Sequence, residues 1–288
     1  NHKELKFLKE QAIVYLFDNR DVCLIPVATK AKIIGTNHGF VYVRMPRGRV
    51  RELITRLMAR LTLMGLIFPR IKYWHLFPGT TDRVGYSPKE QITLPLGIKI
   101  DDYNCNKGSG EVKFLFAGQL KEGKGINTVL EAWELGSLYK YGTLTVCGWG
   151  PLGDKLKESA PSNVFFKGFV TDRELREIFS VSDVFVYPTR GDTYGFVILE
   201  ALASGMKVLT TKIMSGLFDD FSQKGFVEYV DDNIDAFSNA MVACAKNIRN
   251  IREESNSVRN MVKSEYDLKI ISEKLFNYFR LIVMEKNE

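Results

Sequence analysis

The sequence predicts an α/β protein made of two domains, the second of which has a doubly wound parallel sheet. From residue 111 onward, short runs of Val, Ile, Leu and Phe alternate with amphipathic segments. These runs are apolar throughout, which is typical of strands that a parallel sheet buries on both faces. The first hundred residues alternate in the same way but less clearly, and 288 residues suffice for two ordinary domains.

The clearest alternation predicts a second domain at residues 97–265. Its strands are expected at 111–118, 143–148, 163–168, 183–189, 207–211 and 225–230, and its helices at 126–136, 152–159, 171–182, 192–205 and 233–248. Thr171 and Glu174 have the spacing of a capping box, which marks the start of a helix. Ligands of such sheets bind beyond the carboxyl ends of the strands, so the loops there are the expected place of a site.

The first domain is predicted at residues 1–96 and is short. It shows two strand-like runs, "AIVYLF" and "AKIIGTNHG", with a helical connection between them. The segment "LPLGIKIDDYN" is interpreted as the crossing into the second domain. Residues 266–288 predict a terminal helix that packs back toward the first domain, with apolar residues at helical spacing: Ile270, Ile271, Leu275, Tyr278 and Phe279.

Composition limits the classes of function. The net charge of +6 permits an anionic partner, or is a mildly basic surface without a specific role. The four cysteines stand far apart and the three histidines are scattered, which argues against a zinc site or a disulfide framework and favours a reducing, cytosolic setting. We therefore expect no metal and no cofactor. No run of 18 apolar residues predicts a membrane span.

Three loops that follow predicted strands contain glycines: "AGQLKEGKG", "CGWGP" and "RGDTYGF". Together they could form a phosphate cradle, because glycine lets the backbone approach a ligand closely. A single glycine after a strand is more often just a turn, and none of the loops matches the GxxxxGK[ST] nucleotide loop. Lys124 stands just before a helix start, where its ammonium would meet a diphosphate or simply face solvent.

Two acids surround the next helix start. Asp192 precedes the helix, and Glu200 lies about two turns inside it among apolar and small residues. A buried carboxylate costs several kcal/mol unless it is hydrogen-bonded. A pair of ligand hydroxyls, as on ribose, would satisfy Glu200, and so would neighbouring backbone or a cationic side chain.

Residues 112–245 resemble the nucleotide-binding half of a retaining glycosyltransferase of the GT-B fold, and are most similar to glycosyltransferase family 4. The family's glycine-rich loop, its G-x-G-P turn and its acid-x7-Glu motif correspond to "GQLKEGKG" (118–125), "GWGP" (148–151) and "DTYGFVILEALASG" (192–205). The crossing segment resembles the family's "IPNGID" segment. The resemblance implies a GT-B fold with two Rossmann-like domains, of which the N-terminal one is shortened.

The resemblance also implies roles for residues. Glu200 would bind the ribose hydroxyls of a sugar nucleotide, Lys124 would neutralise the departing diphosphate, and Asp192 would contact the donor sugar. His38, in "TNHG", would face that sugar from the first domain. The implied catalytic residues are thus Asp192, Lys124 and His38. The implied donor-binding residues are Gly118, Gln119, Lys124, Gly148, Gly150, Arg190, Gly195, Phe196 and Glu200.

Three features depart from the family's pattern. Asp192 stands where the family usually has Glu, which keeps the charge but shortens its reach. Gln119 stands where the family usually has Arg, which removes a cation that Arg190 is expected to replace. The short first domain indicates either a truncated chain or a reduced enzyme.

The function implied by the resemblance is transfer of a hexose from a UDP- or GDP-sugar to an acceptor with retention, without a metal. The acceptor, whether glycan, lipid-linked or protein, is unknown. The alternatives are a non-catalytic GT-B scaffold that binds sugar nucleotide or a partner protein and, ranked lower, a sugar-nucleotide epimerase.

The positive charge is concentrated in residues 44–70, which contain seven arginines and one acid, Glu52. An apolar stripe of Leu53, Leu57, Leu61 and Met64 runs through this segment. The pattern predicts an interfacial helix on an anionic membrane, hence a cytoplasmic protein peripheral on the cytosolic membrane face. It also fits a site for an acidic acceptor, or a core helix with a solvated basic face. Nucleic acid is not expected, because no interleaved aromatic residues accompany the patch.

Overall fold

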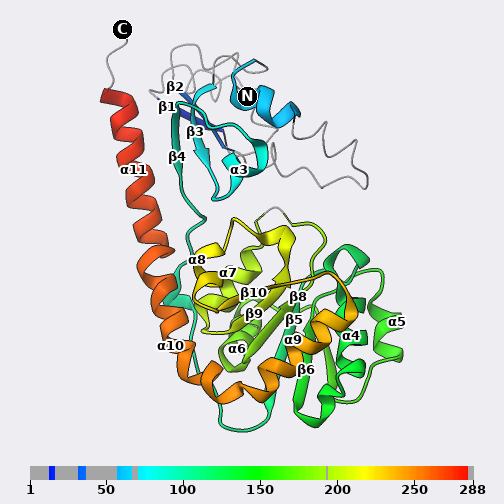
Figure 1. Cartoon of the computed structure of the whole chain (residues 1–288). Helices are drawn as coiled ribbons and strands as arrows, with labels where there is room; N and C mark the ends of the chain where they lie inside the picture. The colour runs from blue at the N-terminus through cyan, green and yellow to red at the C-terminus, as the bar shows by residue number, and fades with distance from the viewer. Residues whose placement is uncertain (1–12, 17–31, 37–56, 67–70, 193, 285–288) are drawn as a thin grey trace. The chain divides into compact units, whose positions relative to one another are not determined.

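The computed structural model describes residues 13–16, 32–36, 57–66, 71–192 and 194–284. The chain divides into two compact units, drawn in Figure 1. Residues 1–97 and 269–288 form unit 1, and residues 98–268 form unit 2. The helix at the end of the chain therefore belongs with the N-terminal residues.

Unit 2 is built on a six-stranded parallel sheet. Its strands are β5 (Val112–Ala117), β6 (Gly142–Cys147), β7 (Val164–Gly168), β8 (Val184–Tyr187), β9 (Lys207–Thr211) and β10 (Val227–Val230). They lie in the order β10-β9-β8-β5-β6-β7. The chain thus starts in the middle, runs to one edge and returns to fill the other half, as in dinucleotide-binding α/β domains. The order reverses between β5 and β8, which pair directly.

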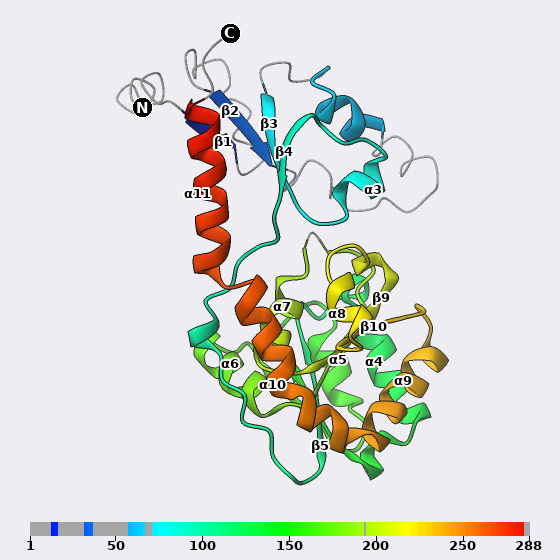
Figure 2. The same ribbon diagram turned by 60° about the vertical axis from the view of Figure 1, so that its left-hand side comes forward.

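Helices cover both faces of this sheet (Figures 1 and 2). They are α4 (Ile126–Leu135), α5 (Gly153–Glu158), α6 (Asp172–Val181), α7 (Phe196–Ala203), α8 (Asp219–Gln223), α9 (Ile234–Lys246) and α10 (Ile248–Glu265). The pair α4 and α9 pack against each other, and α7 packs against both α6 and α10. Two short 3-10 turns, η2 (Ile100–Asp102) and η3 (Glu122–Lys124), precede β5 and α4 respectively.

The core of unit 2 follows from the apolar runs of the sequence. Phe114 and Leu115 of β5, whose side chains lie on opposite faces of the sheet, have no exposed surface, and neither does Trp133 of α4. The rings of Phe114 and Trp133 meet edge to face at 5.6 Å between centroids, a favourable aromatic geometry. The sheet is therefore fixed by side chains buried on both faces, and the loops beyond its strands are left to carry the site.

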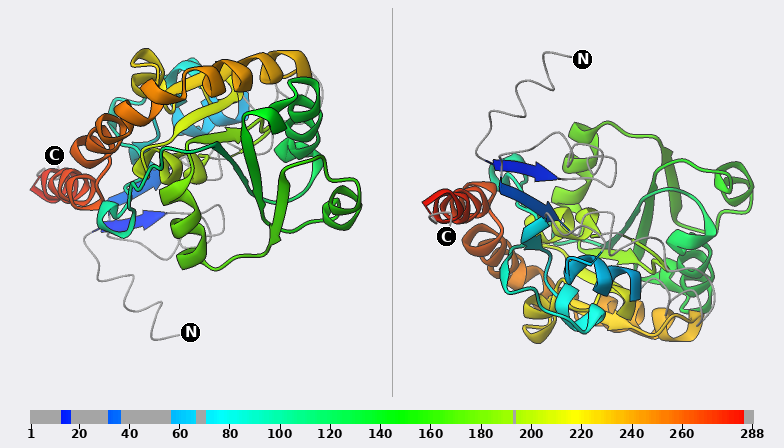
Figure 3. Two further views of the ribbon diagram at one scale, coloured as in Figure 1. Left: turned by 90° about the horizontal axis from the view of Figure 1, so that it is seen from below. Right: turned by 90° about the horizontal axis from the view of Figure 1, so that it is seen from above.

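In the residues that the structure describes, unit 1 contains a four-stranded parallel sheet in sequential order: β1 (Ile13–Leu16), β2 (Lys32–Thr36), β3 (Ile71–Leu76) and β4 (Glu90–Thr93). A short helix, α3 (Thr80–Val84), joins the last two strands, and the C-terminal helix α11 (Leu268–Met284) follows α10. Lys32 donates to the carbonyl of Ile282 at 2.6 Å, so α11 contacts β2. Figure 3 shows α11, in red, beside β1 and β2, in blue.

The structure confirms the α/β class and the parallel, doubly wound sheet of unit 2. All six strands predicted between residues 111 and 230 are present, and the capping box of Thr171 and Glu174 forms as expected. Strands β3 and β4 and helix α10 were not predicted. In α10, five buried residues are spread over 18 positions, so its apolar face is sparse in the sequence.

Two predictions fall wholly or partly outside the described residues. His38 lies outside the described residues, and so does most of the basic segment 44–70. Within that segment residues 57–63 are helical, and the expected stripe is not buried there, since Leu57 is 53% exposed and Met64 43%. No helix in the described parts of the chain is both long and apolar enough to cross a membrane.

Candidate functional site

The candidate site lies at the carboxyl edge of the unit 2 sheet, where the strand order reverses. The loop after β5 carries Lys124, and the loop after β8 carries Asp192. These loops touch, because the backbone N–H of Arg190 donates to the carbonyl of Gly123 at 2.9 Å. Side chains that are 68 residues apart in sequence are thereby brought together at the switch point, where doubly wound sheets have their ligand crevice.

Lys124 and Asp192 form the centre of this crevice. The Nζ of Lys124 lies 2.6 Å from Oδ2 of Asp192, and the same ammonium donates to the carbonyl of Gly191 at 3.3 Å. The two side chains are only 15% and 20% exposed. An ion pair this shielded from solvent is stronger than a surface pair, provided that its other polar atoms are also satisfied.

Two further donors contact Asp192. The hydroxyl of Tyr187 donates to Oδ2 at 2.6 Å, and the backbone N–H of Gly195 donates to Oδ1 at 3.3 Å. Burial works against ionisation of Asp192, but Lys124 and these two donors outweigh it, so the pKa of the carboxyl is lowered. Asp192 is therefore held as a carboxylate, and its partner Tyr187 was not predicted from the sequence.

Glu200 lies on α7, whose N-terminus is the left-handed Gly195. Burial raises the pKa of Glu200, and the nearby Asp172 raises it further, while Tyr103 and Arg176 act in the opposite direction. The hydroxyl of Tyr103 donates to Oε1 of Glu200 at 2.7 Å. The partner of this buried acid is thus a tyrosine from the crossing segment. It is neither the backbone nor the cation that the sequence left open.

The glycines of the first two loops serve to pack those loops together. Gly148 has a φ of 130°, and a Cβ on it would collide with the carbonyl oxygen of Gly118. A Cβ on Gly150 would lie 2.5 Å from the carbonyl oxygen of Leu120. Backbone hydrogen bonds from Gly118 and Leu120 to the second loop accompany this close approach. Loop packing alone therefore explains why these positions are glycine.

The remaining predicted donor-binding residues lie around the crevice but are not all joined to its centre. Arg190 pairs with Asp232 at 2.8 Å, so its guanidinium is turned to that acid rather than to Asp192 or Gln119. Gln119 accepts a hydrogen bond from Lys121 at 2.5 Å. Phe196, the first residue of α7, is 37% exposed.

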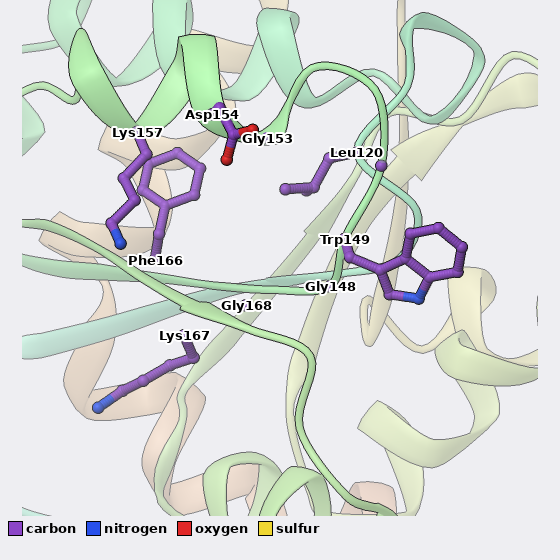
Figure 4. A pocket seen from close by; sticks show the side chains of 10 residues that line it. Leu120, Gly148, Trp149, Gly153, Asp154, Lys157, Phe166, Lys167 and Gly168 are labelled. Carbon is purple, nitrogen blue, oxygen red and sulfur yellow. The ribbon is translucent and has the colours of Figure 1, made fainter.

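Two hollows flank the "GWGP" loop. One, of about 210 Å³, is mainly apolar and is lined by Ala117, Gly118, Gln119, Cys147, Gly148, Trp149, Phe169, Val170 and Leu175. The other, of about 240 Å³, lies between that loop, α5 and β7. Figure 4 shows Leu120 pointing into this second hollow, opposite Asp154 and Lys157 of α5 and Phe166 of β7. Gly148 and Trp149 line both hollows, so this loop separates them.

Metal ligands do not gather anywhere in the described residues: no group of three or more His, Cys, Asp and Glu side chains is arranged to hold an ion. Lys124 is the cation at the centre of the crevice. The groups available at this edge of the sheet are a charged ammonium, two carboxyl groups and the backbone N–H groups at the N-termini of α4 and α7.

The sequence of unit 2 is similar to that of known proteins. Residues 111–247 match the family model described as glycosyl transferases group 1. An uncharacterised glycosyltransferase of Methanocaldococcus jannaschii is 27% identical over 135 residues, which cover 45% of this chain and 33% of that protein. The O-antigen chain mannosyltransferase C of Escherichia coli is 26% identical over 139 residues, covering 43% of this chain and 36% of that protein. The chain spans about a third of the length of these curated relatives.

Solved structures extend the likeness to both units. The Anabaena protein HepE, solved in complex with UDP and glucose, has a TM-score of 0.72 at 14% identity, covering 97% of this chain and 80% of that one. Both units thus have counterparts in a protein of known structure. The chain has the GT-B fold of glycosyltransferases, and its residues 111–247 are similar in sequence to the glycosyl transferases group 1.

Proposed function

We propose that the protein transfers a hexose from a UDP- or GDP-sugar to an acceptor, with retention of configuration and an α-linkage as the outcome. The observation that carries this proposal is the buried contact between Lys124 and Asp192 at the switch point of the sheet. Ligands of doubly wound sheets bind at this point. The HepE structure holds UDP and glucose, and the pneumococcal O-GlcNAc transferase GtfA was solved with UDP and GlcNAc.

In this proposal each end of the donor meets different chemistry. Glu200 accepts hydrogen bonds from the vicinal hydroxyls of the ribose. The apolar hollow that includes Val170 and Leu175 takes the flat base. Lys124 faces the diphosphate, and Asp192 and the backbone of Gly195 face the sugar.

Lys124 can donate hydrogen bonds to Asp192 and to a ligand at the same time. An ammonium has three donors, of which two are occupied by Asp192 and the carbonyl of Gly191. The third donor remains for a diphosphate oxygen. Asp192 keeps the ammonium in place beside the N-terminus of α4, so the charge is oriented before the donor arrives.

The proposed chemistry is stabilisation of a departing diphosphate without a metal. As the bond between the sugar and the diphosphate breaks, negative charge grows on the leaving phosphate. Lys124 and the exposed N–H groups of the helix N-termini supply the opposing charge. The acceptor hydroxyl then attacks from the face that the diphosphate leaves and gives its proton to the leaving phosphate, and attack from that face gives retention.

The acceptor is proposed to be a glycan, a lipid-linked sugar or a protein, reached at an anionic membrane surface through residues 44–70. The described part of that segment presents apolar side chains to solvent, with Leu57 and Met58 53% and 49% exposed and Leu66 66% exposed. Such exposure beside arginines suits an interfacial helix.

The second candidate is a non-catalytic GT-B scaffold that binds sugar nucleotide or a partner protein. It is favoured by the diphosphate side of the crevice, where Gln119 stands in place of an arginine and Arg190 pairs with Asp232. Fewer cations near the leaving group would weaken catalysis while leaving nucleotide recognition by Glu200 in place.

A panel of UDP- and GDP-sugars separates these candidates. We expect thermal stabilisation by at least one donor and slow donor hydrolysis that persists in EDTA. Stabilisation without hydrolysis or transfer supports the scaffold. If no donor in the panel stabilises the protein or is turned over, the proposed function is wrong.

A further inference from the structure

Each acid of the 192–205 segment accepts a hydrogen bond from a tyrosine. Tyr187 donates to Asp192, which also has Lys124 as a counter-charge. Tyr103 donates to Glu200 at 2.7 Å. Within the described parts of the chain, this is the side-chain hydrogen bond that Glu200 receives. Glu200 therefore depends on one hydroxyl for its orientation.

Tyr103 is fixed in place from several sides. It is 5% exposed, and its backbone N–H donates to the carbonyl of Ile100 at 3.0 Å, which closes η2. Arg259 of α10 joins η2 to α7, because its guanidinium donates to the carbonyls of Ala203 at 2.7 Å and Ile100 at 3.2 Å. The segment with Tyr103 and the helix with Glu200 are thus anchored to one another.

The face of the Tyr103 ring is also covered. The guanidinium of Arg176 lies 6.0 Å from the ring centroid, which is a cation–π arrangement. Arg176 pairs with Asp102 at 3.6 Å, next to Tyr103 in the chain. The hydroxyl is therefore aimed by a packed ring and does not have to be ordered when a ligand binds.

The charges around Glu200 make this hydroxyl important. The groups that face it are Tyr103 and Arg176, which favour the carboxylate, and Asp172, which disfavours it. Burial disfavours the carboxylate most of all. Without a donor, a buried carboxylate takes up a proton more readily and becomes a poorer acceptor for ligand hydroxyls.

We propose that Tyr103 is a positioning residue for nucleotide recognition, whose hydroxyl holds Oε1 of Glu200 so that Oε2 receives the vicinal hydroxyls of a ribose. This inference rests on the proposed function, because it takes a nucleotide as the ligand. It adds a residue of the crossing segment to the site, and it explains why a buried acid is tolerated on α7. A carboxylate has about four acceptor positions, so one bond from Tyr103 leaves room for a diol.

The test compares wild type with Tyr103→Phe, which removes only the hydroxyl. Binding of UDP, GDP and their 2′-deoxy counterparts is measured by calorimetry between about pH 5 and about pH 8. We expect Tyr103→Phe to bind the ribonucleotide about tenfold more weakly, in line with the loss of a hydrogen bond that orients a charged group. We also expect it to discriminate less against the 2′-deoxy form, and to lose affinity at a higher pH than wild type does.

Tyr229→Phe is the matched control, since the hydroxyl of Tyr229 also donates to a carboxylate, that of Asp219 at 2.9 Å. It should leave affinity, discrimination and pH profile unchanged. The ratio of ribonucleotide to 2′-deoxynucleotide affinity is taken on one preparation, so partial misfolding of a variant does not imitate the effect. In a Glu200→Gln background, Tyr103→Phe should add little, because both changes act through one contact.

The outcomes separate the inference from the proposed function. If wild type binds neither UDP nor GDP, both are wrong. If wild type binds one of them and Tyr103→Phe keeps its affinity, its discrimination and its pH profile, the role of Tyr103 is overturned while the proposed function stands.

Discussion

Lys124 and Asp192 form a 2.6 Å ion pair that joins the loop after β5 to the loop after β8. The pair lies where the strand order of the unit 2 sheet reverses. Asp192 is one methylene shorter than the glutamate usual in the family that the segment resembles. Its position is nevertheless well defined, because Tyr187 and Gly195 also donate to it. Lys124 and Tyr187 thus both donate hydrogen bonds to the shorter side chain of Asp192.

The first prediction concerns this pair. Lys124→Met and Asp192→Asn should each weaken donor binding, the first by about 10- to 100-fold, because a charge-assisted hydrogen bond to the diphosphate is lost. Since the two side chains share one contact, the double variant should bind far better than the product of the two losses implies. Calorimetric titration of UDP-glucose and GDP-mannose into all four proteins measures this coupling. Strictly additive losses would contradict a shared role.

The second prediction concerns the stability cost of Glu200. Its pKa is raised in the folded protein, so the folded state binds the proton more tightly than the unfolded chain does. Stability is therefore greatest where Glu200 is protonated, and it falls as the pH rises from the unfolded value through the raised folded one. Glu200→Gln removes this fall in stability, because the amide does not ionise. The variant should therefore be more stable than wild type near neutral pH and equally stable near pH 4. It should also lose donor binding.

Urea unfolding at about pH 4 and about pH 7 measures this difference. Glu131→Gln, on the exposed side of α4, is the control and should show no such dependence on pH. A Glu200→Gln variant that is less stable than wild type at neutral pH would show that Glu200 stabilises the fold. Its burial would then need no ligand to explain it.

Much of unit 2 was predictable because its strands are continuous apolar runs, three of which end at glycines. Lys124, Asp192 and Glu200 were predicted as site residues because motif spacing defines their positions relative to helix starts. Their partners were not found. Tyr103 lies 97 residues before Glu200, and only the packing of the crossing segment on α7 brings the two together.

The sequence alone also did not show why the loop positions such as Gly148 are glycine. A glycine after a strand fits a turn, a ligand cradle or a close backbone contact, and the sequence alone does not distinguish these three explanations. The collision of a Cβ at Gly148 with the neighbouring loop becomes visible only when both loops are placed. Similarly, the arginine near the crevice suggested a compensating cation, but Asp232, 42 residues farther along, binds it.

The third prediction concerns the basic segment. The double variant Leu57→Gln with Met58→Gln should reduce flotation with liposomes that contain anionic lipid, because apolar contacts with the lipid are lost. Stability should change little, since both side chains are about half exposed. Leu135→Gln, at a position on α4 that is 57% exposed, is the control. Equal flotation of wild type with neutral and with anionic liposomes would contradict an electrostatic contribution.

The last prediction separates the two explanations of the glycine loops. Gly148→Ala forces a side chain against the carbonyl of Gly118 at a φ of 130°, so the protein should lose about 5 °C or more in Tm. Gly108→Ala is the control, because nothing lies within 4 Å of a Cβ there. If Gly148→Ala instead keeps its Tm and loses only donor affinity, the glycine serves ligand approach rather than loop packing. Thermal unfolding and nucleotide titration on the same samples therefore decide between the two.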